Sequence, residues 1–85
     1  VPFVKGWSGE WVNYTVVATG DFTLLARVAS SGGTVDVSGV GTGISVDTGG
    51  GFDWVELGSI SLSGETTVTI TFNNDDIQIS DLRFE

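Results

Sequence analysis

A two-residue alternation of apolar and polar side chains runs through most of this chain and limits what it can fold into. The clearest example is residues 66–72, where Val68, Ile70 and Phe72 alternate with three threonines. Successive side chains of a β-strand point to opposite faces, so this period predicts strands with one buried and one exposed face. Helix-favouring Ala, Lys, Arg and Gln are scarce, so we expect no helix.

The alternating segments are separated by turns rich in Gly, Ser, Asn and Asp, which supply the backbone conformations that turns need. We expect the turns at residues 18–21, 30–33, 48–51, 63–65 and 73–76. The strands between them are expected at residues 11–17, 22–29, 34–40, 43–47, 52–62, 66–72 and 77–85. About seven short strands at this spacing are typical of a single antiparallel β-sandwich of jelly-roll type, and residues 1–85 are expected to form one domain.

The parity of the alternation changes inside two of these strands. We therefore expect a β-bulge near Gly58 and Ser59 and another near Ser80 and Asp81, because one extra residue moves the following side chains to the other face. With these bulges, the inward positions form one predicted core: Val12, Tyr14, Val16, Phe22, Leu24, Ala26, Val28, Val68, Ile70, Phe72, Ile79, Leu82 and Phe84.

The composition excludes most kinds of chemistry. The chain has no Cys, His or Met, which rules out disulfides, thiolate or imidazole metal sites, and catalysis by a Ser–His or Cys–His pair. We therefore do not expect an enzyme. The net charge of −8, with only three Lys and Arg, argues against nucleic acid or an anionic membrane as partner. No apolar run approaches the roughly 18 residues that membrane insertion needs.

Several segments together resemble the family 6 carbohydrate-binding modules and their relatives in families 35 and 36. The resemblance spans about residues 9–85 and rests on residues 9–16 (GEWVNYTV), 20–24 (GDFTL), 27–30 (RVAS), 48–50 (TGG) ahead of Trp54, 64–72 (GETTVTITF) and 77–84 (IQISDLRF). It implies a calcium-containing β-jelly roll, attached to extracellular polysaccharide-degrading enzymes, that binds glycans without catalysis. An extracellular or cell-surface location also agrees with the Gly/Thr/Ser-rich, Lys-poor composition.

The chain departs from the family at three points. The opening strands that normally carry acidic calcium ligands are missing, since only eight residues precede Gly9. Ser80 stands where the family usually has an Asp, although Asp81 is adjacent. The loop aromatic that stacks on sugar in many relatives aligns with Gly51, which leaves Phe52 and Trp54 as displaced candidates.

Exposed aromatic side chains are the groups that glycan binding needs. The apolar face of a pyranose ring packs on an aromatic ring, while its hydroxyls hydrogen-bond to amides and carboxylates. The candidates for this role are Trp7, Trp11, Phe52, Trp54, Asn73 and Asn74. The alternative is that Trp54 belongs to the core of a small sandwich.

Three carboxylates are the best candidates for a calcium site, namely Asp75, Asp76 and Asp81. Ca²⁺ prefers carboxylate and carbonyl oxygens, which the Asn-Asn-Asp-Asp segment at residues 73–76 and the end of the last strand provide. The spacing does not match the twelve-residue calcium loop, so a solvated hairpin turn is the alternative for residues 73–76.

The sequence also allows a second function, that of a structural subunit of an extracellular homopolymeric filament or surface assembly. A sandwich that lacks strands can be completed by a strand from a neighbouring copy, because unpaired sheet edges accept one. Residues 1–8 are the candidate intermolecular segment, with Val1, Phe3 and Trp7 as its contacts. The expected partner is therefore either a polysaccharide or another copy of the chain.

Overall fold

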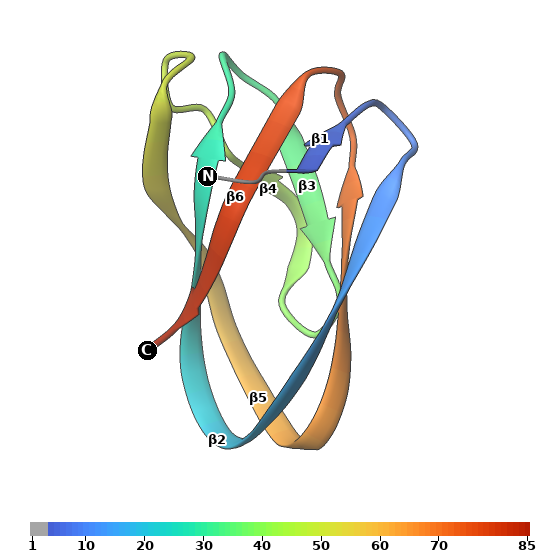
Figure 1. The fold of residues 1–85 in the computed structure, drawn as a ribbon, viewed down its shortest axis with the longest axis vertical. Helices are drawn as coiled ribbons and strands as arrows, with labels where there is room; N and C mark the ends of the chain where they lie inside the picture. Colours follow the sequence, from blue (N-terminus) through green and yellow to red (C-terminus); the bar gives the residue numbers. More distant parts are fainter. Residues whose placement is uncertain (1–3) are drawn as a thin grey trace.

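Two long strands, β2 (Trp11–Ala29) and β5 (Phe52–Phe72), pair with each other along their whole length and carry most of the fold. The computed structural model describes residues 4–85 (Figure 1). Both long strands bend halfway, so that the two-stranded ribbon they form folds over and its two halves enclose one core (Figure 1). The folding-over lets a single sheet bury its inner face as a sandwich does.

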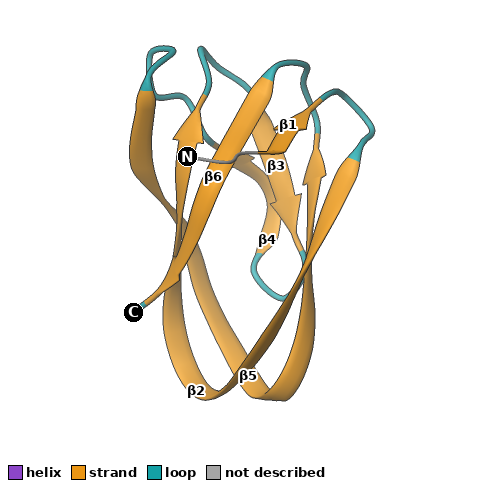
Figure 2. Cartoon of the chain, in the orientation of Figure 1, coloured by secondary structure: helices purple, strands orange, loops and turns teal. Residues whose placement is uncertain are grey.

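The other four strands extend this bent two-stranded ribbon on both sides. They are β1 (Val4–Gly6), β3 (Thr34–Val37), β4 (Gly41–Ser45) and β6 (Ile77–Phe84). The sheet order is β1-β6-β2-β5-β3-β4, and every neighbouring pair is antiparallel. Figure 2 shows that the described residues form strands and loops, with no helix, which confirms the predicted all-β antiparallel class. Among residues 4–85, no helix is long and apolar enough to cross a membrane.

The predicted turns at residues 18–21 and 63–65 are wrong. Pairing continues through both segments, from Val17 with Glu65 to Gly20 with Leu62, so four expected strands are two bent ones. Gly20 and Gly64 have φ angles of 135° and 75°, which only glycine adopts without strain, and they bend the strands without ending them. With the unexpected β1 added, the expected seven strands become six.

Both predicted bulges are present, one of them displaced by a residue. Val28 pairs with Ile79 and Arg27 with Asp81, so Ser80 is the extra residue in β6. In β5 the extra residue is Leu57, next to the expected Gly58. Each bulge restores the inward parity of the residues that follow it.

The core is larger on one side of the sandwich than the alternation predicts. Seven predicted core residues are buried: Leu24, Ala26, Val28, Val68, Ile70, Phe72 and Ile79. Six are only partly buried and pack against the others: Val12, Tyr14, Val16, Phe22, Leu82 and Phe84. The core also contains Val35, Val37, Val46, Leu57, Ile60, Leu62 and Ile77, because β3, β4 and the first half of β5 cover its far side.

Candidate functional site

Trp11, at the start of β2, presents its indole on the outward face of the sheet. Its side chain is 63% exposed, whereas the next residue, Val12, turns toward the core. Trp11 pairs with Thr71 of β5, and Thr71 pairs in turn with Asp36 of β3. Residues in register share a face, so these three side chains form a row across three strands, over about 10 Å.

A second row runs beside the first. Asn13 pairs with Thr69, and the Thr69 hydroxyl donates a hydrogen bond of 2.7 Å to Oδ1 of Asn13. Asn73 lies just beyond the end of β5, and its Nδ2 donates to Oδ1 of Asp36 at 2.9 Å. We call this surface the Trp11 face; it consists of Trp11, Asn13, Asp36, Thr69, Thr71 and Asn73.

Asp36 is held as an acceptor on this face. The hydrogen bond from Asn73, followed by one from the backbone N–H of Gly43, lowers the pKa of the Asp36 carboxyl below its usual value. At neutral pH the group is therefore an ionised carboxylate that only accepts hydrogen bonds. Asn73 also donates to the hydroxyl of Thr34, so two side-chain bonds fix its amide beside Asp36.

The Trp11 face thus combines a flat aromatic surface with fixed hydroxyl, amide and carboxylate groups. An exposed indole attracts apolar C–H groups, and the polar groups beside it can hydrogen-bond to hydroxyls. This combination suits a ligand that has both apolar faces and many hydroxyls.

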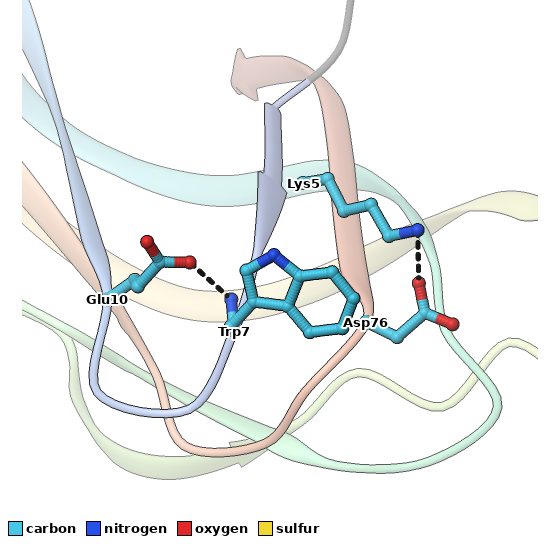
Figure 3. A network of polar contacts seen from close by, with 4 residues as sticks. All are labelled: Lys5, Trp7, Glu10 and Asp76. Atoms are coloured by element: carbon cyan, nitrogen blue, oxygen red, sulfur yellow. Dashed lines mark hydrogen bonds and ion pairs between the residues drawn. The ribbon is translucent and has the colours of Figure 1, made fainter.

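Trp7 lies in the loop between β1 and β2, among charged side chains (Figure 3). The Lys5 ammonium lies 5.1 Å from the centre of the indole and 3.0 Å from Oδ1 of Asp76. Glu10 accepts a hydrogen bond from the backbone N–H of Trp7 (Figure 3). The indole is 47% exposed, so Trp7 is accessible. Its contacts described above are with Lys5 of β1 and with Glu10 of the loop.

The polar segment at residues 73–76 joins three parts of the fold. Asp75 accepts a hydrogen bond from the backbone N–H of Ser8 at 2.8 Å, and Asn74 accepts one from the N–H of Thr34. Asp76 has a φ of 64°, a left-handed conformation that Asp tolerates better than most residues. The segment is an exposed turn between β5 and β6 whose side chains hold neighbouring loops.

The three carboxylates expected to bind calcium are not gathered at one point. Asp75 and Asp76 lie in the turn before β6, whereas Asp81 lies within β6 and pairs with Arg27 of β2. Asp81 accepts a hydrogen bond from the Ser80 hydroxyl, and its charge adds to burial in raising the pKa of Tyr14. Within residues 4–85, no group of three or more acidic side chains is arranged to hold a metal ion.

Phe52 and Trp54 lie on the outward face of the other half of the folded sheet. Trp54 pairs with Arg27 and is 41% exposed, so it is not part of the core. The Arg27 guanidinium lies 4.8 Å from the centre of the Phe52 ring and donates a hydrogen bond to Ser80. These two aromatics belong to a surface separate from the Trp11 face.

The structure places residues 4–6 of the N-terminal segment within the chain's own sheet. Val4 pairs with Ile79 and Gly6 with Ile77, so β1 is an intramolecular edge strand. The N–H of Gly9 donates to the carbonyl of Phe72, which fastens the loop that follows. Val1 and Phe3, expected as assembly contacts, lie outside the described residues.

Of the six expected glycan-binding residues, Trp11 and Asn73 are brought together on one face. Sequence reasoning missed Asp36, Thr69 and Thr71 as their neighbours. The parity of residues 34–37 was the available signal for Asp36, because a carboxylate between two inward valines has to point outward. Its position opposite Thr71 depends on strand register, which no local pattern in the sequence shows.

No protein-family model matches this chain, and no curated protein does either.

Proposed function

We propose that this chain is a non-catalytic carbohydrate-binding module that holds a glycan on the Trp11 face. One observation carries the proposal: an indole that is 63% exposed stands in register with Thr71 and Asp36 on a regular sheet. Leaving a large aromatic ring in water forgoes the stabilisation of burying it, and rigid strands hold this one beside fixed polar groups.

The chemistry of the face favours an uncharged glycan. Asp36 is ionised, and the whole chain carries a net charge of −8, so a uronate or sulfated polysaccharide would be repelled. The hydroxyls of a neutral sugar can donate to Asp36 and to the carbonyl oxygen of Asn13. The pyranose ring would pack on Trp11. The resemblance to carbohydrate-binding modules points to the same class of ligand, secreted or at the cell surface.

Binding to neutral polysaccharides such as xylan and mixed-linkage β-glucan tests this proposal by affinity electrophoresis and titration calorimetry. We expect Trp11→Ala to weaken binding by about 30-fold, because truncating a central aromatic contact commonly costs about 2 kcal/mol. Trp54→Ala is the matched control, since it removes an exposed indole from the outward surface of the other half of the folded sheet. Equal losses in the two variants would contradict the assignment of the site to Trp11.

The same titration is carried out with Ca²⁺ and with a chelator. A bound Ca²⁺ would stabilise the folded state and raise Tm, whichever carboxylates hold it. Asp75, Asp76 and Asp81 each take part in contacts within the chain, so their simultaneous use as ligands would require rearrangement. Failure to bind any neutral glycan in either condition would refute the carbohydrate-binding function.

A second function, as a structural subunit of an extracellular homopolymer, is favoured by the edges of the sheet. The edge strand β4 contains Gly41, Thr42, Gly43, Ile44 and Ser45, with neither a charge nor a proline. Natural edge strands are usually protected from pairing with other chains by Lys, Pro or a bulge. β4 has no Lys and no Pro, and its protection is limited to a register shift against β3 between Val35 and Val37.

Light scattering over a range of protein concentrations tests the structural function. A subunit that assembles through its edges gives a mass that rises with concentration, and an open head-to-tail contact gives filaments visible by electron microscopy. A mass equal to that of one chain up to millimolar concentration would exclude this function and would leave the glycan-binding proposal untouched.

A further inference from the structure

A second open edge lies along the first half of β2. Residues 11–17, here called the β2 edge, pair on one side with residues 65–71 of β5. On the other side, β6 pairs with β2 only from Leu24 to Ala29. Within residues 4–85, no strand pairs with the outer side of the β2 edge, so its backbone N–H and C=O groups there are free for another strand.

The sequence of the β2 edge gives it no protection against pairing. Its seven residues, WVNYTVV, contain no charge, no Gly and no Pro, and the next charged residue along the strand is Asp21. The pairing with β5 has no bulge in this segment. Trp11 and Val17, at its two ends, are 63% and 77% exposed and are the most exposed large apolar side chains of the described residues.

The core is also incomplete beside this edge. Val12, Tyr14 and Val16 point inward but are only partly buried, whereas Ile70 and Val68, which pair with the first two, are fully buried. Leu82 and Phe84, at the end of β6, are partly buried as well. Burial, and after it the charge of Asp81 on β6, raises the pKa of Tyr14. Apolar surface therefore remains uncovered along the β2 edge.

The pattern of the β2 edge is complementary to itself. When two copies run antiparallel about a two-fold axis at Tyr14, Trp11 lies opposite Val17, Val12 opposite Val16, and Asn13 opposite Thr15. Each pair then joins residues of the same kind on the same face, which is the arrangement that stabilises adjacent strands. Both of the most exposed apolar side chains find an apolar partner.

We propose that the chain forms a two-fold symmetric dimer in which the β2 edges of two copies pair antiparallel, centred on Tyr14. A second copy is the partner because a two-fold contact requires a self-complementary surface, and this edge has one. The seven residues of the β2 edge carry no charge of their own. The carboxylate whose charge reaches Tyr14 at the two-fold axis is Asp81 of β6. The inference rests on the second proposed function, assembly of copies, and identifies one of its contacts.

The proposed dimer would join the Trp11 faces of the two copies. The sheets of the two copies join in the order β4-β3-β5-β2, followed by β2-β5-β3-β4 of the partner. The two Trp11 residues then lie on one continuous face. They are separated by six residues along the strand direction, or about 20 Å. A long glycan could contact both, so its affinity would exceed that of a single face.

Cysteine cross-linking tests the register, since the chain has no Cys of its own. In the double variant Asn13→Cys/Thr15→Cys, the thiol introduced at position 13 of one copy lies directly opposite the thiol introduced at position 15 of the other, at a distance that a disulfide spans. We expect mild oxidation to convert most of this variant to a covalent dimer that reductant reverses. In each single variant, Asn13→Cys or Thr15→Cys, the thiols introduced in the two copies lie diagonally across the strand pair and not directly opposite each other. These variants should cross-link at least 10-fold less.

A second measurement needs no oxidation. Thr15→Lys puts two ammonium groups diagonally across the two-fold axis, and we expect a dimer dissociation constant at least 10-fold higher by sedimentation. Ser59→Lys adds the same charge at an exposed position of β5 away from the β2 edge and should leave association unchanged. Circular dichroism melts show whether both variants fold.

The outcomes separate this inference from the function on which it rests. If Thr15→Lys leaves the dimer dissociation constant unchanged, or if single and double variants cross-link equally, the β2 pairing is overturned. Assembly through another edge of the sheet would then still stand. A parent protein that is one chain at every concentration would overturn both. Register-specific cross-linking together with loss of association in Thr15→Lys supports both.

Discussion

The variant Ile70→Asp is expected to lose about 4 kcal/mol or more of its free energy of unfolding, which approaches the whole stability of a domain this small. Ile70 is fully buried, with Val12 beside it on β2 and Val37 on β3. A carboxylate at this position would lie among apolar side chains with no hydrogen-bond donor provided for it. It would either remain as an unpaired buried charge or take up a proton, and both are costly.

The chain's few cations cannot relieve that charge. Lys5 is paired with Asp76, Arg83 with Glu85, and Arg27 contacts Ser80 and the Phe52 ring. All three contacts are made by side chains outside the core. A buried carboxylate without a cation is destabilising because nothing replaces its lost hydration.

Urea denaturation followed by tryptophan fluorescence measures this loss. The matched control is Thr67→Asp, which places the same charge on the same strand at an exposed position, where we expect a change within about 0.5 kcal/mol. A midpoint for Ile70→Asp equal to that of the parent would mean that this face of β5 is not the buried one.

Adding one methyl group at Gly6 is expected to produce the second large effect. Gly6 is buried in β1, and a Cβ at this position would lie 2.2 to 2.4 Å from three carbons of the Phe72 ring. The ring is itself buried, so it has little room to move away. We expect Gly6→Ala to cost about 1 to 3 kcal/mol, the usual cost of overpacking a core.

Thermal melts compare Gly6→Ala with Gly41→Ala, since both glycines lie in edge strands. A Cβ at Gly41 meets no atom within 4 Å, so alanine there should be neutral or stabilising by about 0.4 to 1 kcal/mol through the unfolded chain. We therefore expect opposite signs, with Tm of Gly6→Ala lower by roughly 5 to 20 °C. A Gly6→Ala protein as stable as the parent would show that β1 does not pack on Phe72.

This close packing also bears on the role of the N-terminal segment. Gly6 lies against the Phe72 ring, and residues 4–6 pair with β6 of the same chain. The N–H of Gly9 donates to the carbonyl of Phe72. Deleting residues 1–7 would therefore uncover a core residue and unpair the start of β6. Assembly is better tested at the β2 edge, where substitutions do not disturb the core.

The proposed glycan face and the proposed dimer share Trp11 without competing for it. In the dimer, the backbone edge of β2 is used for pairing, while the indole remains on the outward face of the sheet. Thr15→Lys addresses assembly. Trp11→Ala addresses glycan binding when it is measured at concentrations where no dimer forms, since the proposed dimer also places Trp11 opposite Val17. Coupling between them would appear as tighter glycan binding at concentrations where the dimer forms.

The turns are where sequence reasoning about the fold failed. Gly20 and Gly64 lie in segments whose composition predicts a reversal of the chain, but each lies within a paired strand and bends that strand instead of ending it. A glycine with a positive φ serves both purposes, and the strand pairing around it decides which. The bulge at Ser80 could be predicted because it leaves a local trace, a change of parity between Ile79 and Leu82.

The sequence by itself determined the strand character of the chain, the parity of each strand and thereby which side chains face the core. It also excluded chemistry that needs Cys or His. These properties are local, because a strand alternates its side chains whatever it pairs with. Only the tertiary structure decided that Trp11, Thr71 and Asp36 form one row, that Trp54 lies on the other half of the folded sheet, and that the acidic residues 75, 76 and 81 do not converge. Those relations depend on register and on the bend of the sheet, which arise from contacts between residues far apart in the chain.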